Sequence, residues 1–191
     1  MRRNIFVKAC LSAGALMSGS VSLIAKTVSA FRTIKGFKIS NGKDRYDRNL
    51  APFDGDTIFT KISPKDTDGD LFIFESTRIK EGGPPHHIHF DQDEWWYVLA
   101  GEFLIKIGDV TYEAKAGDSV FGPRAVPHSF AKVGDDIGKL LITFQPAGKM
   151  EEFFEKLSAG VTKNMTAEER TKFSADHGIT RVGPPIKQLK E

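Results

Sequence analysis

Short runs of alternating apolar and polar residues dominate the chain between residues 57 and 144. They are rich in Ile, Val, Phe, Tyr and Thr and are bounded by Gly, Pro or Asp, a pattern typical of β-strands separated by turns. We expect strands at residues 57–62, 71–79, 95–99, 102–107, 110–114, 119–121, 128–133 and 140–144. Gly108-Asp109 stands between two of these runs and predicts a two-residue hairpin turn. Short strands without intervening helices favour an all-β sandwich or barrel.

The hydrophobic period changes after residue 148. Between residues 149 and 159 the apolar positions recur at the spacing of an amphipathic helix. Thr166 and Glu169 form a capping-box pattern, which predicts a second helix that ends near Gly178. We expect the Gly183-Pro184-Pro185 stretch to be loop.

Residues 1–30 contain basic residues and no acidic residue, with an apolar stretch at 9–25 and a small-residue end at Val28-Ser29-Ala30. This order predicts a secretory signal peptide, and Arg2-Arg3 resembles a twin-arginine export signal. We therefore expect a protein that is exported to the periplasm or secreted. An uncleaved anchor or an amphipathic N-terminal helix is the alternative, although the apolar stretch is too weak for a membrane span of about 20 residues.

The segment 1–30 also carries much of the positive charge. The formal net charge is +2 at pH 7, and removal of this segment, with its four basic residues, lowers it to −2. No basic excess then remains for binding nucleic acid. The only cysteine, Cys10, lies in the same segment, so a processed chain would have no disulfide and no Cys-based zinc site.

Four of the five histidines gather in two places. His86, His87 and His89 lie together, and His128 begins a later predicted strand. Residues two apart in a strand point to the same face, so His87 and His89 project together, and Glu94 opens the next strand. If these strands line one interior, three imidazoles and a carboxylate converge as ligands for a first-row divalent metal. Hydrogen-bonded core groups without a metal are the alternative, although an unpaired buried carboxylate is costly.

Two segments carry a resemblance to a known family. Residues 83–101, with the His-x-His pair, Glu94 and Gly101, resemble the first motif of the cupins, and residues 117–128 resemble the second. Ala125 and Lys132 depart from the second motif, at positions that shape turns and packing. The resemblance implies that one divalent transition metal binds His87, His89, Glu94 and His128, and leaves its identity open among Fe, Mn, Ni, Cu, Co and Zn.

The resemblance also implies a domain plan. The fold expected is the cupin double-stranded β-helix, a jelly-roll barrel over residues 57–147. An N-terminal arm at 31–56 precedes it, and a short C-terminal helical extension with a tail follows at 148–191. A homodimer is common in this family.

Three aromatic residues are candidates for the wall of a substrate pocket: Trp96, Phe121 and Phe130. Parity with Glu94 turns Trp96 inward, and plain core packing is the alternative for all three. His86, on the opposite strand face from His87, and His177, beside a helix end, are expected to lie outside the site.

Residues 146–154 and the run that follows Glu94 resemble single-domain cupins of the quercetin-dioxygenase type. This resemblance implies a dioxygenase that acts with O₂ on a small flavonol-like or enolic substrate, with Glu94 taking the hydroxyl proton. A non-redox metal-dependent isomerase or decarboxylase is an alternative that would prefer a cationic cavity. A non-catalytic cupin that binds a small molecule is another.

Overall fold

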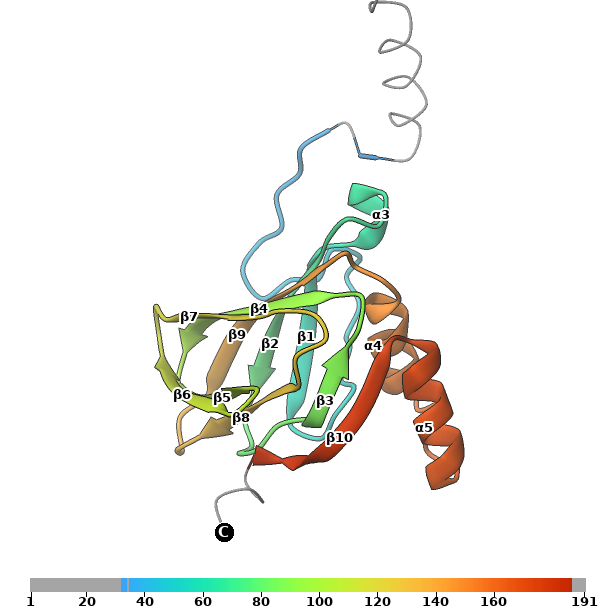
Figure 1. Cartoon of the computed structure of the whole chain (residues 1–191). Helices are drawn as coiled ribbons and strands as arrows, with labels where there is room; N and C mark the ends of the chain where they lie inside the picture. Colours follow the sequence, from blue (N-terminus) through green and yellow to red (C-terminus); the bar gives the residue numbers. More distant parts are fainter. Residues whose placement is uncertain (1–31, 34, 187–191) are drawn as a thin grey trace, which may run out of the picture. The chain divides into compact units, whose positions relative to one another are not determined.

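The computed structural model describes residues 32, 33 and 35–186 and divides the chain into two units, 1–36 and 37–191. The second unit contains the two sheets and three helices of Figure 1. The predicted signal peptide and Cys10 lie outside the described residues, so export stays a prediction. Within the described part of the chain, we find no helix with the length and apolar character that a membrane crossing requires.

The second unit is mostly β, as the strand pattern predicts, and its ten strands form two antiparallel five-stranded sheets. The first sheet has the order β1 (Asp56–Ile62), β2 (Phe72–Arg78), β9 (Gly138–Gln145), β4 (Asp93–Ala100), β7 (Ser119–Gly122). The second has the order β10 (Ile179–Pro185), β3 (Pro85–His89), β8 (His128–Val133), β5 (Glu102–Ile107), β6 (Val110–Lys115). All eight expected strands are present, and β5 and β6 pair across the Gly108-Asp109 turn.

Three helices accompany the sheets: α3 (Pro64–Thr67), α4 (Met150–Ser158) and α5 (Ala167–Asp176). The two predicted helices are confirmed, and the capping box of Thr166 and Glu169 opens α5. The single turn of α3 was not expected. It forms because the Ser63 side chain caps it and the Asp66 carboxylate accepts a hydrogen bond from the Ser63 backbone N–H.

Strand β10 corrects the expectation of a loop at Gly183-Pro184-Pro185. It pairs antiparallel with β3 and forms one edge of the second sheet, beside α5 (Figure 1). Its register shifts between Arg181 and Gly183 and again before Pro185. Pro cannot donate to a ladder, and an edge strand with irregular register tolerates it. The second sheet therefore extends beyond the range 57–147 expected for the barrel.

The core lies between the sheets and continues under α4. Phe72, Phe74 and Phe144 stack in the first sheet, with ring centroids 5.1–6.4 Å apart. Phe154 of α4 lies 5.1 Å from Phe74, and Phe153 of α4 stacks on Phe173 of α5 at 5.5 Å. The helices thus bury their apolar faces against the open end of the sandwich.

The buried carboxylate of Asp44 holds the segment before β1 in place through hydrogen bonds. Asp44 accepts hydrogen bonds from the backbone N–H groups of Thr60 and Tyr46, each at 2.8 Å, and from Arg48 Nε at 3.0 Å. Arg48 also reaches Glu151 of α4 at 2.9 Å, so one ion-pair network joins the segment, β1 and α4. Burial acts to raise the pKa of Asp44, but the Arg48 side chain and the backbone donors outweigh it and hold the pKa below its ordinary value.

We expect Asp44→Asn to lower the free energy of unfolding at neutral pH by about 1–3 kcal/mol, since charged hydrogen bonds are lost and buried donors are left unsatisfied. The depressed pKa means that the carboxylate contributes stability above its unfolded value of 3.8, and that this contribution is lost as the pH falls through the folded-state pKa. The difference between wild type and variant should shrink in urea unfolding carried from about pH 7 to about pH 3.

The matched control is Asp47→Asn, at an exposed position three residues away. It should change the stability by less than about 0.5 kcal/mol at any pH. A penalty for Asp44→Asn that does not vary with pH would contradict this account of the network.

Candidate metal centre

The strand pleat brings three histidines and one carboxylate together. His87 and His89 lie on the same face of β3, and His128 of β8 stands directly opposite His87 in the ladder. Glu94 comes from β4 in the other sheet, so the cluster spans the sandwich. All four residues are buried, with exposed fractions between 0% and 9%.

The ligand atoms of these residues are close enough to share one ion. One nitrogen or oxygen atom from each lies within 4.8 Å of all the others. Glu94 Oε2 is 3.1 Å from His128 Nε2 and 3.6 Å from His89 Nε2. The imidazole centroids lie 4.7–5.4 Å apart. Metal–ligand bonds of about 2.0–2.2 Å fit among these atoms after small side-chain rotations.

Backbone carbonyls fix which ring nitrogens carry protons. His87 Nδ1 lies 2.7 Å from the Pro85 carbonyl oxygen, and His128 Nδ1 lies 2.9 Å from that of Val126. A carbonyl oxygen only accepts, so Nδ1 is the donor in both rings. Each neutral ring then presents a lone pair at Nε2, the arrangement that orients histidine as a metal ligand.

Burial keeps two of the imidazoles neutral. It lowers the pKa of His87 well below the ordinary value, and the neighbouring His89 and His128 act in the same direction. Burial also lowers the pKa of His89 to about 4, although the charge of Glu94 opposes it. Neutral imidazole is the form that binds metal, so these rings need not lose a proton near pH 7.

The acceptors of the cluster lack donors. His89 Nε2, His128 Nε2 and Glu94 Oε2 are buried and have no hydrogen-bond partner within the described part of the chain. Two acceptors 3.1 Å apart, His128 Nε2 and Glu94 Oε2, repel each other unless a cation lies between them. A divalent ion satisfies these atoms together, so the residues fit a metal better than a hydrogen-bonded core.

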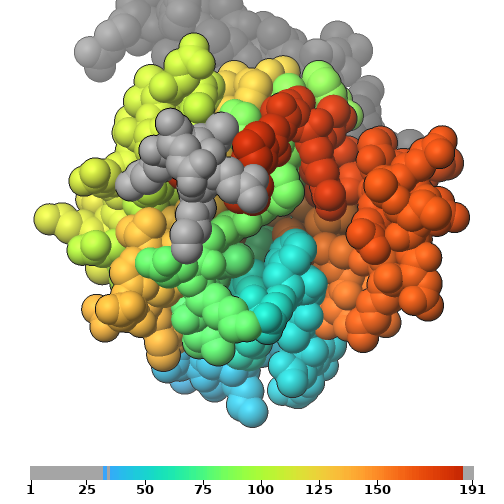
Figure 2. Space-filling model, turned by 90° about the horizontal axis from the view of Figure 1, so that it is seen from below, coloured from blue at the N-terminus to red at the C-terminus, as the bar shows by residue number. Residues whose placement is uncertain are grey.

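The cluster forms one wall of a cavity of about 120 Å³. His87, His89 and Glu94 line it, whereas His128 lies behind them against the Trp96 ring, with 5.4 Å between ring centroids. Aromatic side chains dominate the other walls: Phe53, Phe74, Phe130, Phe144, Phe153, Phe154 and Phe173. Seen from below, a hollow opens between β10 (red), the helical segment (orange), β1 (cyan) and the β2–β3 connection (green) (Figure 2).

The three predicted pocket residues take three different positions in the structure. Phe130 lines the cavity. Trp96 is fully buried and points inward, but it packs behind His128 and over Gly122, where an added Cβ would come within 2.8 Å of its ring. Phe121 does not line the cavity: it pairs with Trp95 on the outer face of the first sheet and is 58% exposed.

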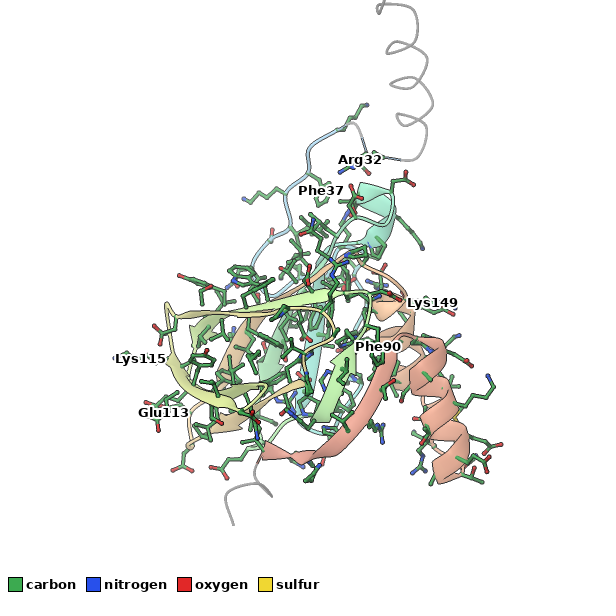
Figure 3. The ribbon with its side chains drawn as sticks, in the orientation of Figure 1. Arg32, Phe37, Phe90, Glu113, Lys115 and Lys149 are labelled. Atoms are coloured by element: carbon green, nitrogen blue, oxygen red, sulfur yellow. The ribbon has the colours of Figure 1, made fainter. Side chains whose placement is uncertain are left out.

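The outer face of the second sheet carries exposed side chains, as the outer face of the first sheet does at Phe121. Glu113 and Lys115 of β6 are exposed and point away from the sandwich (Figure 3).

The remaining histidines stay outside the cluster, as expected. His86 Nδ1 lies 2.9 Å from Ser129 Oγ, and His177 caps α5 with its Nδ1 donating to the Phe173 carbonyl oxygen at 2.7 Å.

The sequence interpretation missed the polar residues of the cavity. Asp56, Ser76 and Arg78 line it from the first sheet, and Arg170 and Arg181 line it from α5 and β10. Ser76 and Arg78 follow Phe74 at two-residue spacing along β2, so the three side chains share one strand face. This spacing was the sequence signal that could have predicted Ser76 and Arg78 as cavity residues. The helix and β10 residues carried no such signal, because their approach to the site depends on long-range packing.

Comparison with known proteins agrees with this geometry. Residues 74–144 match the family model described as the cupin domain, and the two antiparallel five-stranded sheets form a cupin sandwich. An uncharacterized protein of Methanocaldococcus jannaschii is 29% identical over 66 residues, which is 35% of this chain and 53% of that protein. The chain spans about half the length of the curated relatives it matches.

Solved structures show the same fold. KdgF from Halomonas sp. superposes with a TM-score of 0.50 at 17% identity, over 59% of this chain and 94% of that chain. An RmlC-like cupin from Shewanella frigidimarina gives 0.47 at 22% identity, over 61% and 96% of the two chains. At 17% identity the likeness to the KdgF structure shows the fold alone.

Gln92 lies in the turn between β3 and β4, directly before Asp93. It is buried, its Oε1 has no donor within the described residues, and its amide opposes the lowering of the His89 pKa by burial. Two glycines make room for it: a Cβ on Gly148 would lie 1.8 Å from Gln92 Nε2, and one on Gly178 would lie 3.2 Å from Oε1. His89 Nδ1 is likewise buried without a hydrogen-bond partner within the described residues, so a small rotation of the Gln92 amide would pair the two atoms and orient the His89 ring.

We expect the protein purified without chelator to hold about one equivalent of divalent metal, and His128→Ala or Glu94→Ala to lose it. Elemental analysis of the purified proteins measures this directly. His86→Ala, a change on the same strand but on the opposite face from His87, is the matched control and should retain the metal. Metal retained in both cluster variants, or none bound by wild type after reconstitution, would rule out the four-ligand site.

We expect Gln92→Leu to weaken metal affinity by about 10–100-fold, because the outer partner of a ligating histidine fixes its orientation. Competition against a chromophoric chelator gives the affinity. Gln145→Leu, at an exposed position on β9, serves as the control and should leave the affinity unchanged. Equal affinities for wild type and Gln92→Leu would remove the positioning role.

Proposed function

We propose that this protein is a metal-dependent dioxygenase that acts on a small, mostly apolar substrate of flavonol-like or enolic type. The observation that carries the proposal is the position of the cluster, whose His87, His89 and Glu94 face a cavity walled by phenylalanines. Aromatic walls with a few convergent polar groups suit the binding of a planar organic molecule. The resemblance of residues 83–101 and 146–154 to cupins of the quercetin-dioxygenase type supports the same choice.

The metal, when bound, would supply a Lewis acid that chelates adjacent oxygens of the substrate and a redox centre for O₂. The chain supplies the rest. Glu94, whose Oε2 has no hydrogen-bond donor among the residues that the structure describes, accepts the proton of a substrate hydroxyl at the cavity wall. Phe74 and Phe144 exclude water beside the cluster and hold the rings of the substrate by stacking.

One observation favours a second candidate, a non-redox isomerase or decarboxylase acting on a carboxylated substrate. Such an enzyme prefers a cationic cavity, and Arg78, Arg170 and Arg181 do line this one. The aromatic walls outnumber these arginines around the metal cluster, so the dioxygenase stays our first choice.

We expect the metal-loaded protein to consume O₂ when quercetin is added, and Glu94→Ala to lose this activity together with its metal. An oxygen electrode and elemental analysis on the same samples measure both. His86→Ala should retain uptake, since His86 lies outside the cluster. Zinc as the sole bound metal, with no O₂ uptake from any enolic or phenolic substrate, would reject the dioxygenase and leave the non-redox candidate.

A further inference from the structure

A buried arginine in the cavity wall has unused hydrogen-bonding capacity. Arg78, at the end of β2, is 8% exposed, and its Nη1 donates to Asp56 Oδ2 at 2.8 Å. The other oxygen of Asp56 accepts from Ser76 Oγ at 2.7 Å. Asp56 is thus satisfied, whereas Arg78 Nε is buried without an acceptor within the described residues. A guanidinium has five N–H donors, and among residues 32, 33 and 35–186 the side-chain acceptor that engages it is Asp56.

The surroundings hold the guanidinium in place. Its central carbon lies 5.4 Å from the centroid of the Phe130 ring, and Phe130 also lines the cavity. The ion pair with Asp56 fixes one side of the Arg78 guanidinium group. A ligand in the cavity therefore meets a cation that is already oriented, so little side-chain entropy is lost when it binds.

Strand register separates the backbone of this arginine from Glu94 of the metal cluster. Phe72 of β2 pairs with Phe144 of β9, which pairs in turn with Glu94 of β4. Arg78 lies six residues beyond Phe72, roughly 20 Å of strand at about 3.3 Å per residue, and on the same face. The backbone of Arg78 is thus far from Phe72 along β2, with Phe74 and Ser76 lining the cavity wall between them. The Arg78 guanidinium reaches Phe130, two residues from His128 along β8.

The charges along the cavity favour an anion beside Arg78. Arg170 and Arg181 line the same cavity, from α5 and β10. Its lining carboxylates are Asp56, which Arg78 and Ser76 engage, and Glu94, which belongs to the metal cluster. The lining thus carries three arginines and two carboxylates that are already engaged, and Arg181 stands opposite His87 of the cluster in the β10–β3 ladder.

We propose that Arg78 is a specificity-determining residue that binds the carboxylate of an elongated aromatic acid, whose opposite end reaches the metal cluster. The proposal rests on the use of this cavity as the substrate site and holds for either of the two reactions above. A planar guanidinium matches a carboxylate with two parallel N–H···O bonds, and such charge-assisted bonds are the strong ones in a desolvated site. The phenylalanine walls accommodate the aromatic body of the acid.

The test uses trans-cinnamate and its neutral analogue cinnamamide as probes, with calorimetric titration of the full-length, metal-loaded protein. Wild type should bind the carboxylate more tightly than the amide. Arg78→Met should weaken cinnamate by at least about tenfold and leave cinnamamide within about twofold, because only the charge-assisted hydrogen bonds are removed. Arg124→Met removes an exposed arginine that pairs with Asp93 outside the cavity, and it should change neither affinity.

Loss of Arg78 leaves Asp56 buried without its counter-ion, so the double variant Arg78→Met/Asp56→Asn provides the same test if the single variant does not fold. Equal losses for both probes, no loss for cinnamate, or no binding of either probe to wild type would overturn the proposal. Metal content and O₂ uptake are measured on the same samples. A protein that binds cinnamate through Arg78 but takes up no O₂ would reject the dioxygenase and keep this inference.

Discussion

The structure depends on one electrostatic constraint: several buried lone pairs face one another, and the described part of the chain places no proton donor between them. Glu94 Oε2 and His128 Nε2 approach to 3.1 Å, and the Nδ1 atoms of His87 and His128 are already committed to backbone carbonyls. Such an arrangement is unfavourable in a low-dielectric interior unless a cation is shared. The strands that carry these groups must therefore be held rigidly. The packing behind them contributes to this, because the Trp96 ring lies against His128.

The same constraint organises the cavity. A metal ion at the cluster would make one wall of the cavity polar, and the walls beyond it are aromatic. Arg78 and Asp56 add a second polar site to the lining, as an ion pair in which Arg78 Nε has no acceptor within the described residues. The aromatic acid that we propose as ligand matches this lining with a carboxylate for the arginine and an apolar body for the phenylalanine walls.

The sequence predicted the parts of the fold that depend on local chemistry. Alternation marked the strands, and the Thr166–Glu169 capping box marked α5, because both patterns act over a few residues. The convergence of His87, His89, Glu94 and His128 was predictable because the pleat and the motif spacing constrain it. Phe121 was assigned to the wrong side because its facing depends on its register with Trp95, which parity within one strand does not give.

The contribution of the C-terminal elements could not be predicted for a related reason. Gly and Pro in the 183–185 stretch indicate a turn when only the local sequence is considered. The stretch becomes part of a strand because β3 offers an open edge with which it pairs. Likewise Arg170 and Arg181 become cavity residues only when α5 and β10 have docked. Such long-range contacts leave no local pattern in the sequence.

The pairing of β10 with β3 has a consequence for how the protein matures. In that ladder Ile179 stands opposite His89, and Arg181 stands opposite His87. The strand that carries two of the four clustered residues thus keeps an open edge until a segment far along the chain has been synthesised and has docked. Pairings of such high sequence separation form late, because loop closure must come first. Any ion that the cluster takes up after β3 has paired with β10 is therefore acquired only once residues 179–185 have been synthesised.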